Sequence, residues 1–283
     1  ANDTTPDLDY HSTSALELNG GTIKDISGNN ADLTLPSTGA SGSLGANKAL
    51  VIDGNVPSVL SVTSTKANGG YKAGETIPIS VNFNQIVILT GSNQIMMETG
   101  PTDQAASYVS GSGTATLLFN YIVSNGDNTN DLDYISESAL SAGDGLKDAS
   151  SNNAVLTLPT PGTSGSLSAN KNLVIDTTSP AIFSVSSVKA SAAYKVGESI
   201  PITVTFDDKV TVAGVPQITL ETGSSDAVVN YTSGTGSTDL IFNYSVGASD
   251  QSSDLSYIST SALSLNSGTI QDSLGNNAIL TLP

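Results

Sequence analysis

Carboxylate and amide side chains recur at a fixed spacing in three loops of this 283-residue chain. The loops read "IKDISGNN", "LKDASSNN" and "IQDSLGNN" and begin at Ile23, Leu146 and Ile270. In each loop an Asp stands four residues before an Asn. Oxygens of this kind are the ligands of Ca²⁺, which takes about six to eight of them. The same residues also form ordinary turns by hydrogen-bonding their own backbone, so one loop alone leaves both interpretations open.

The charge balance favours a cation as partner. Asp and Glu number 26 against 9 basic residues, all of them Lys, which gives a net charge of −17. Nucleic acid is recognised mainly through Lys and Arg contacts to phosphate, and anionic membranes also attract basic segments, so both partners are disfavoured. A large negative charge also keeps proteins soluble, and that explains the total without explaining the positions.

Other bulk features remove further classes of function. The chain has no Cys, which excludes disulfides and thiolate metal sites. No apolar run is long enough to span a bilayer, so we expect no membrane insertion of this stretch, and its first residues lack the pattern of a signal peptide. The single histidine, His11, corresponds to Ile135 and Ile258 in the later copies. A histidine-based triad or metal site is therefore not expected, and no phosphate-binding loop is present. We therefore expect that this chain has no enzymatic activity.

An internal repeat organises the chain. The segment "YKAGETIPISVNF" begins at Tyr71 and "YKVGESIPITVTF" begins at Tyr194, 123 residues later. The segments "NKALVID" and "NKNLVID" end at Asp53 and Asp176, which is the same step. Self-similarity at a fixed period indicates tandem domains. The frame predicts the C-terminal part of a repeat at 1–53, a complete repeat at 54–176 and a repeat without its last strand at 177–283.

Within each repeat the pattern predicts strands. "IPISVNF" and "IPITVTF" alternate apolar and polar residues at a period of two, and Gly, Ser, Asn and Asp separate the successive segments. No segment has helical periodicity over three turns. About seven short strands in roughly 120 residues are typical of an immunoglobulin-like β-sandwich. We expect an all-β chain of such domains arranged as a rod.

The succession "VIDTTSP", "GESIPITVTF", "ITLETG", "FNY" and "DLSY" resembles tandem bacterial immunoglobulin-like repeats. The resemblance covers the whole chain. It implies β-sandwich modules in the stalks of large secreted adhesins and cell-surface proteins, with calcium at the domain junctions. It also implies an extracellular location on the bacterial surface.

Counting strand directions gives a first arrangement of the acids. If consecutive strands run antiparallel from the linker, then four side chains meet at the junction with the following domain. They are Glu75, Asp148, Asn152 (or Asn153) and Asp176. The same count groups Asp25, Asn29 and Asp53 at the first junction, and Glu198 with Asp272 in the last repeat. Carboxylates with amide and carbonyl oxygens would suit Ca²⁺ better than Mg²⁺, which demands a tighter octahedron.

A second set of acids belongs, on the same count, to the opposite end of each repeat, facing the preceding domain. Its members come from the "DLDY" and "ETG" segments and are Asp9, Glu98, Asp131, Asp133, Glu221 and Asp254. These acids could complete a calcium site or form turns, and the sequence leaves the two interpretations even.

The resemblance therefore implies an extender stalk that calcium stiffens, with neighbouring repeats of the same protein as partners, and the placement of the acids agrees with calcium at the junctions. Two alternatives remain. The chain could be a subunit of a surface layer or of a filament in which one copy completes the next by strand addition. It could instead be a ligand- or carbohydrate-binding module that presents loops at one end of a sandwich.

Overall fold

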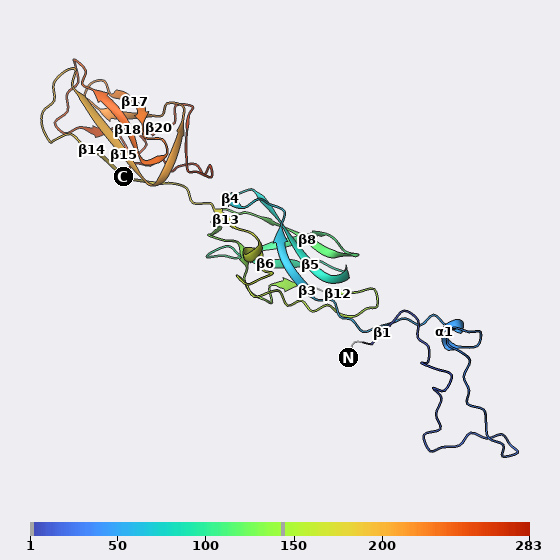
Figure 1. The fold of residues 1–283 in the computed structure, drawn as a ribbon. Helices are drawn as coiled ribbons and strands as arrows, with labels where there is room; N and C mark the ends of the chain where they lie inside the picture. Colours follow the sequence, from blue (N-terminus) through green and yellow to red (C-terminus); the bar gives the residue numbers. More distant parts are fainter. Residues whose placement is uncertain (1–2, 143–144) are drawn as a thin grey trace.

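The computed structural model describes residues 3–142 and 145–283, and nearly all its regular structure is β (Figure 1). Residues 3–53 contain only short elements: β1 (Thr4–Thr5), α1 (Leu44–Asn47) and β2 (Ile52–Asp53). No described residue of this first segment belongs to either of the buried apolar clusters. Among the described residues, no helix is long and apolar enough to cross a membrane.

The second part of the chain forms a curled antiparallel sheet with eight strands, in the order β10-β6-β7-β8-β5-β12, with β3 beside β5 and β11 beside β6. A smaller sheet, β4-β13-β9, lies at one end, and in it β13 runs parallel to β4. The elements are β3 (Val59–Ser64), β4 (Gly69–Tyr71), β5 (Thr76–Leu89), β6 (Gln94–Glu98), β7 (Gln104–Ser110), β8 (Thr114–Ile122), β9 (Asn128–Thr129), β10 (Asp133–Tyr134), β11 (Leu140–Ser141), β12 (Leu146–Lys147), α2 (Leu167–Asn170) and β13 (Leu173–Asp176).

The third part repeats the larger sheet with the order β14-β15-β18-β17-β16-β19, and β20 and β21 pair with β16 and β15. Its strands are β14 (Ile182–Ser187), β15 (Ser199–Ala213), β16 (Gln217–Glu221), β17 (Ala227–Ser233), β18 (Ser237–Ser245), β19 (Ser256–Tyr257), β20 (Leu263–Ser264) and β21 (Thr269–Gln271). The prediction of a mostly β chain is confirmed, and the two similar curled antiparallel sheets indicate two β domains. We call these parts the second and third domains.

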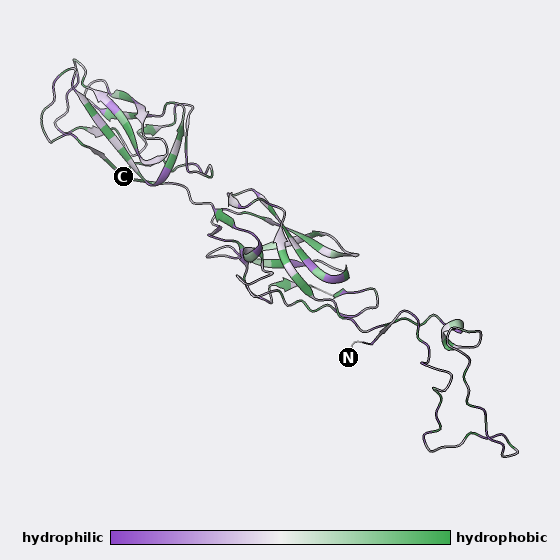
Figure 2. Cartoon of the chain, in the orientation of Figure 1, coloured by the Kyte–Doolittle hydropathy of each residue, from purple (hydrophilic) through white to green (hydrophobic). Residues whose placement is uncertain are grey.

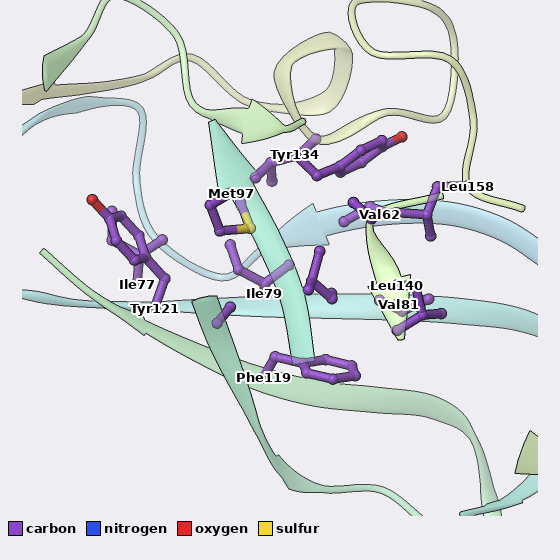
Figure 3. Packing of buried hydrophobic residues seen from close by; sticks show 14 of the residues in the cluster. Val62, Ile77, Ile79, Val81, Met97, Phe119, Tyr121, Tyr134, Leu140 and Leu158 are labelled. Atoms are coloured by element: carbon purple, nitrogen blue, oxygen red, sulfur yellow. The ribbon is translucent and has the colours of Figure 1, made fainter. Parts of the chain in front are cut away.

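Strand alternation builds each core. In β5 the side chains of Ile77, Ile79 and Val81 are fully buried while their neighbours face outward, and Phe119 of β8 packs on the same face (Figure 3). Figure 2 shows the same alternation of apolar and polar residues along the long strands of both domains. Burying one face of a sheet in this way provides the main driving force for folding.

A proline inside each long strand is tolerated for a local reason. Pro78 of β5 pairs with Asn120 of β8 on one side. On its other side β3 has already ended, because Ser64, its last residue, pairs with Ile79. Pro201 of β15 has the same setting. A proline lacks the N–H that a ladder needs, so it fits only where the neighbouring strand has stopped.

Candidate functional site: the loop and linker at each domain junction

The Asp of each repeated loop organises the loop through its own carboxylate. Asp148 accepts hydrogen bonds from the main-chain N–H of Asn152 at 2.8 Å and from Nδ2 of the same residue at 2.9 Å. Asp25 and Asn29 make the same pair of bonds at 2.8 Å each. The third copy does so at 2.8 and 2.7 Å between Asp272 and Asn276. The four-residue spacing is therefore the spacing of a side-chain-closed turn.

The residue before the Asn has a left-handed backbone in all three copies. Its φ is +87° at Gly28 and +85° at Gly275, where glycine adopts the conformation freely. In the second copy the position is Ser151, with φ of +72°. A non-glycine residue costs energy there, so the bonds from Asp148 hold a turn that Ser151 alone would not favour.

The Asn side chain then reaches the linker that enters the same domain. Nδ2 of Asn152 donates to the main-chain oxygen of Asp53 at 2.8 Å, and Nδ2 of Asn276 donates to that of Asp176 at 3.0 Å. We call each trio of linker Asp, loop Asp and loop Asn a linker clamp. Beside each clamp, Val155 N–H bonds to the carbonyl of Pro57, and Ile279 N–H to that of Pro180.

The linker is also held by the domain that it leaves. The main-chain N–H of Thr177 and the hydroxyl of Thr178 both donate to Oδ1 of Asn128, at 2.9 and 3.2 Å. Thr177 Oγ1 accepts from the N–H of Gly126 at 2.9 Å. The short segment 176–180 is thus bonded to both of the domains that it connects.

Two direct contacts bridge the second and third domains. Nζ of Lys72 donates to the carbonyl of Gly275 at 3.0 Å. The side chain of Leu274 lies over the backbone of Gly70, so that a Cβ at position 70 would come 2.5 Å from Cδ2 of Leu274. Any side chain at position 70 would therefore require the side chain of Leu274 to move.

The hydrogen bonds of the loop stabilise the ionised carboxylates. Burial acts to raise the pKa of Asp148, but hydrogen bonds from Asn152, Ser150 and Gln85 outweigh it, and the pKa lies below its ordinary value. The pKa of Asp25 is lowered chiefly by the side-chain bond from Asn29. Donors that bind the charged form lower a carboxyl pKa in this way.

The structure corrects the predicted grouping of acids. Asp148 lies with Asp53 at the end where the linker enters the second domain, whereas Glu75 and Asp176 lie at the end where the chain leaves it. Figure 1 shows β12 and β4 at these opposite ends. Asp25 and Asn29 bind each other, while Asp53 accepts a bond from Ser150 of the second domain.

The third domain departs from the prediction in the same manner. Asp272 belongs to the clamp at Asp176, where the chain enters the domain. Glu198 lies elsewhere: its carboxylate accepts from the N–H of Lys195, and its backbone pairs with Val246. The predicted pairing of Glu198 with Asp272 is therefore wrong.

The predicted grouping of the acids is wrong because β5 is one continuous strand. β5 runs without reversal from Thr76 to Leu89 and passes through a register shift between Asn82 and Val87. The count of alternating strands assumed one more reversal, which inverts the position of every later loop. The chain after Asp148 also runs back along the domain in one direction, parallel to β3 at Ser58 and Val155.

The second set of acids also lies at the opposite end from the one predicted. Asp133 pairs with Glu98 across β10 and β6, and Asn128 of β9 pairs with Asp176 of β13. These residues therefore face the end where the chain leaves the domain. Glu221 pairs with Ser256 in the matching place of the third domain, next to Asp254.

Most of these acids have structural partners. Asp133 is buried and accepts hydrogen bonds from Gly162 N–H at 3.1 Å and Ser168 Oγ at 2.6 Å, which holds the loop around α2. Asp9 does the same in the first segment by accepting from the N–H of Gly39. Asp131 accepts from the N–H of Leu173 in β13. Their turn-forming role is the one that the contacts support.

One position next to the clamp was missed by sequence reasoning. Nε2 of Gln85 donates to Oδ2 of Asp148 at 3.2 Å and to the carbonyl of Asn55 at 3.3 Å. Two carboxamides, from Gln85 and Asn152, thus bind oxygens that converge from the linker and the loop. The repeat places Asp208 of the third domain where the second has Gln85. The alignment of the two repeats could have identified this position from the sequence alone.

The donor set at the second junction suits a hard cation better than the donor set at the first junction does. There the linker has Asp176, the loop has Asp272 and Asn276, and the repeat places Asp208 of β15 at the position of Gln85. These residues carry oxygen donors of the kind that Ca²⁺ prefers. Within the described ranges, no group of three or more His, Asp and Glu side chains is already gathered closely enough to hold a metal. Comparisons with family models, curated proteins and solved structures find no match to this chain.

Proposed function

We propose that the chain is a section of an extracellular stalk, built from tandem immunoglobulin-like domains of a bacterial cell-surface protein. The observation that carries the proposal is the double attachment of the linker. Asn276 bonds the linker to the third domain and Asn128 bonds it to the second. A linker bonded on both sides restricts the angle between domains, which is what a spacer needs and a flexible tether lacks.

Repetition supports the same role. Both linkers meet the following domain through the same Asn-to-Asp carbonyl bond, at 2.8 and 3.0 Å. A device that recurs once per domain propagates one geometry along an array, as in repeat proteins whose units contact only their neighbours. A receptor site would need only one copy.

Small-angle scattering of the chain in solution tests this function. We expect the distance distribution of an elongated particle, with the second and third domains end to end. Asn276→Ala should broaden that distribution, because it removes the bond to the Asp176 carbonyl. A compact distribution, with the two domains folded back on each other, would rule out the stalk.

We further infer that the second junction binds Ca²⁺ through Asp176, Asp208 and Asp272. The net charge of −17 and the replacement of Gln85 by Asp208 support this inference. The bound cation would offset the repulsion among these carboxylates and so add to the hold of the clamp. Extracellular modules bind calcium at about 10⁻⁴–10⁻³ M, a range that confines the effect to the outside of the cell.

Calorimetry of the chelator-treated chain, with and without millimolar CaCl₂, tests the calcium inference. We expect calcium to raise the unfolding temperature of the third domain. Asp208→Gln, which copies the second domain, should lose this rise, whereas the exposed Asp226→Gln should keep it. An unfolding temperature that calcium leaves unchanged in the unmodified chain would refute the site.

A further inference from the structure

The second domain has an open hollow of about 790 Å³ beside the start of β6, which we call the β6 hollow. Its volume lies within the range of small-molecule sites. Three of its lining residues form a row across neighbouring strands, because Gln94 of β6 pairs with Ser107 of β7 and with Ser141 of β11. All three side chains are exposed. The other lining residues are Gly91, Ser92, Asn93 and Tyr108.

A buried carboxamide without a partner lies in this lining. The side chain of Asn93 is 5% exposed, and neither its Nδ2 nor its Oδ1 has a hydrogen bond to any residue that the structure describes. Such a group weakens the folded state unless something else satisfies it. The third domain has Pro216 at the corresponding position and so avoids this cost. An unsatisfied polar side chain beside a hollow indicates a place for a ligand.

A second carboxamide in the β6 hollow has lost the partner that its counterpart keeps. In the third domain Nε2 of Gln217 donates to Oδ1 of Asn230 at 2.9 Å. The second domain has Gln94 and Ser107 at these positions. Gln94 is bonded to Ser141 through its main-chain oxygen, at 3.3 Å, and no described side chain pairs with its carboxamide. The shorter serine therefore leaves an amide and a hydroxyl group for a ligand.

The lining favours a neutral ligand that carries hydroxyl groups. None of the seven lining side chains is charged at neutral pH, so a charged ligand would lose its hydration without gaining an opposite charge. Hydroxyl groups donate and accept, as carboxamides and serine side chains do. The ring of Tyr108 is fixed edge-on to Phe119 at 5.8 Å, and its hydroxyl accepts from the N–H of Ser112 at 3.0 Å. A fixed aromatic ring beside several polar groups matches a sugar, which has both C–H faces and hydroxyls.

An extended peptide matches this place less well than a sugar. A peptide that binds as an added strand needs a strand edge with unpaired main-chain groups. At Gln94 both edges of β6 are already occupied, one by Ser107 and the other by Ser141. Side chains must therefore recognise the ligand, and these side chains are hydroxyls and amides.

We propose that the β6 hollow binds a neutral monosaccharide unit. Sugar hydroxyls pair with the carboxamides of Asn93 and Gln94 and with the hydroxyl of Ser107, and the sugar ring packs beside Tyr108. Protein atoms cover both polar atoms of Asn93 in this structure, so binding includes a shift of the segment 91–92. The main chain of this segment makes no hydrogen bond to any described residue, which keeps the cost of such a shift low. Sugar binding goes beyond the proposed stalk function and does not depend on it.

Nitrogen–proton correlation NMR of the whole chain, titrated separately with glucose, galactose, mannose and N-acetylglucosamine, tests the site. We expect at least one of these sugars to shift the amide signals of Ser92, Gln94 and Ser107 in a saturable manner. Glycerol and the acidic sugar N-acetylneuraminic acid are the controls and should not do so. A chain whose signals none of the neutral sugars shifts would overturn the proposal. Saturable shifts confined to other parts of the chain, or caused by the acidic sugar alone, would overturn it as well.

Variants that copy the third domain test the contacts. Asn93→Pro should weaken sugar binding roughly tenfold, because it removes the buried carboxamide. The variant should fold, since Pro216 accepts the same main-chain bond in the third domain. Ser107→Asn should weaken binding several-fold by pairing with the carboxamide of Gln94. Ile122→Ser also copies the third domain, at an exposed position outside the β6 hollow, and should bind as the unmodified chain does. Undiminished binding by Asn93→Pro and Ser107→Asn would overturn the proposal, and the scattering test of the stalk is unaffected by either result.

Discussion

The side chain of Asn276 donates a hydrogen bond to the main-chain oxygen of Asp176, 100 residues earlier in the chain, at 3.0 Å. Asn152 makes the same bond to Asp53 across 99 residues, at 2.8 Å. Each Asn is in turn held by the Asp four residues before it. The repeated loop thus joins a domain to its own incoming linker, and it does so with its own hydrogen bonds.

Removing the clamp should destabilise the second domain. We expect Asn152→Ala to lower the free energy of unfolding by about 1–2 kcal/mol, because it removes a bond to the Asp148 carboxylate and leaves the Asp53 carbonyl without this donor. Urea denaturation followed by circular dichroism measures the change. Asn153→Ala, at the exposed neighbouring position, should be close to neutral. Equal losses in the two variants would contradict the clamp.

Acid should weaken the second domain through Asp148. The pKa of this carboxyl is lowered from an ordinary value of 3.8 in the folded protein. Its contribution to stability is therefore complete above that value and is lost as the pH falls through the lower folded pKa. Thermal unfolding from pH 2 to pH 7 should show that Asp148→Asn costs stability at neutral pH and progressively less below about pH 4.

The control for this pH dependence is Asp103→Asn, which changes an exposed residue of the β6–β7 loop. Because this side chain is exposed, the variant should have nearly the stability of the unmodified chain at neutral pH. A constant difference between Asp148→Asn and the unmodified chain at every pH would contradict the account.

A side chain added at Gly70 should weaken the contact between this residue and Leu274. Gly70→Ala brings a methyl group to 2.5 Å from Leu274 in the present geometry, so the leucine must move and the junction should loosen by about 1 kcal/mol. Leu274→Ser, which copies Ser150 of the preceding clamp, should remove most of this penalty in the double variant. A double-mutant cycle on the stability of the junction measures the coupling, and additive effects would argue against direct contact.

A buried asparagine offers a stabilising change. Asn93 is 5% exposed, and the structure records no hydrogen-bond partner for its Nδ2 or Oδ1. The third domain has Pro216 at this position, and its carbonyl accepts from the N–H of Tyr231 as that of Asn93 accepts from Tyr108. Asn93→Pro should therefore raise the free energy of unfolding by about 1 kcal/mol. A destabilised variant in chemical denaturation would contradict this expectation.

The repeat and the strands could be predicted from the sequence because both are written in local patterns. Alternation in "IPISVNF" predicts a strand with one buried face, and the structure buries Ile77, Ile79 and Val81. The 123-residue step predicts two similar domains, and the two larger sheets have the same strand order. Both features depend on residues close together in the chain or on a repeated spacing, so they can be read from the sequence.

The positions of the loops could not be predicted in the same way. They depend on how often the chain reverses, and the register shift after Asn82 lets β5 continue where a turn was expected. Whether a stretch such as residues 82–87, "NFNQIV", turns or bulges is settled by packing between distant strands. The role of Asn152 was equally hidden, because its partner Asp53 lies in a linker 99 residues away.

The central claim is that the linker clamp fixes the angle between domains, and a distance measurement tests it most directly. Since the chain has no Cys, spin labels can be attached at Asp103→Cys and Ser224→Cys, one exposed position in each domain. Double electron–electron resonance should give one narrow distance distribution for this pair. Adding Asn276→Ala should broaden it several-fold, while Asn277→Ala should leave it narrow. Equally broad distributions with and without Asn276 would contradict the claim.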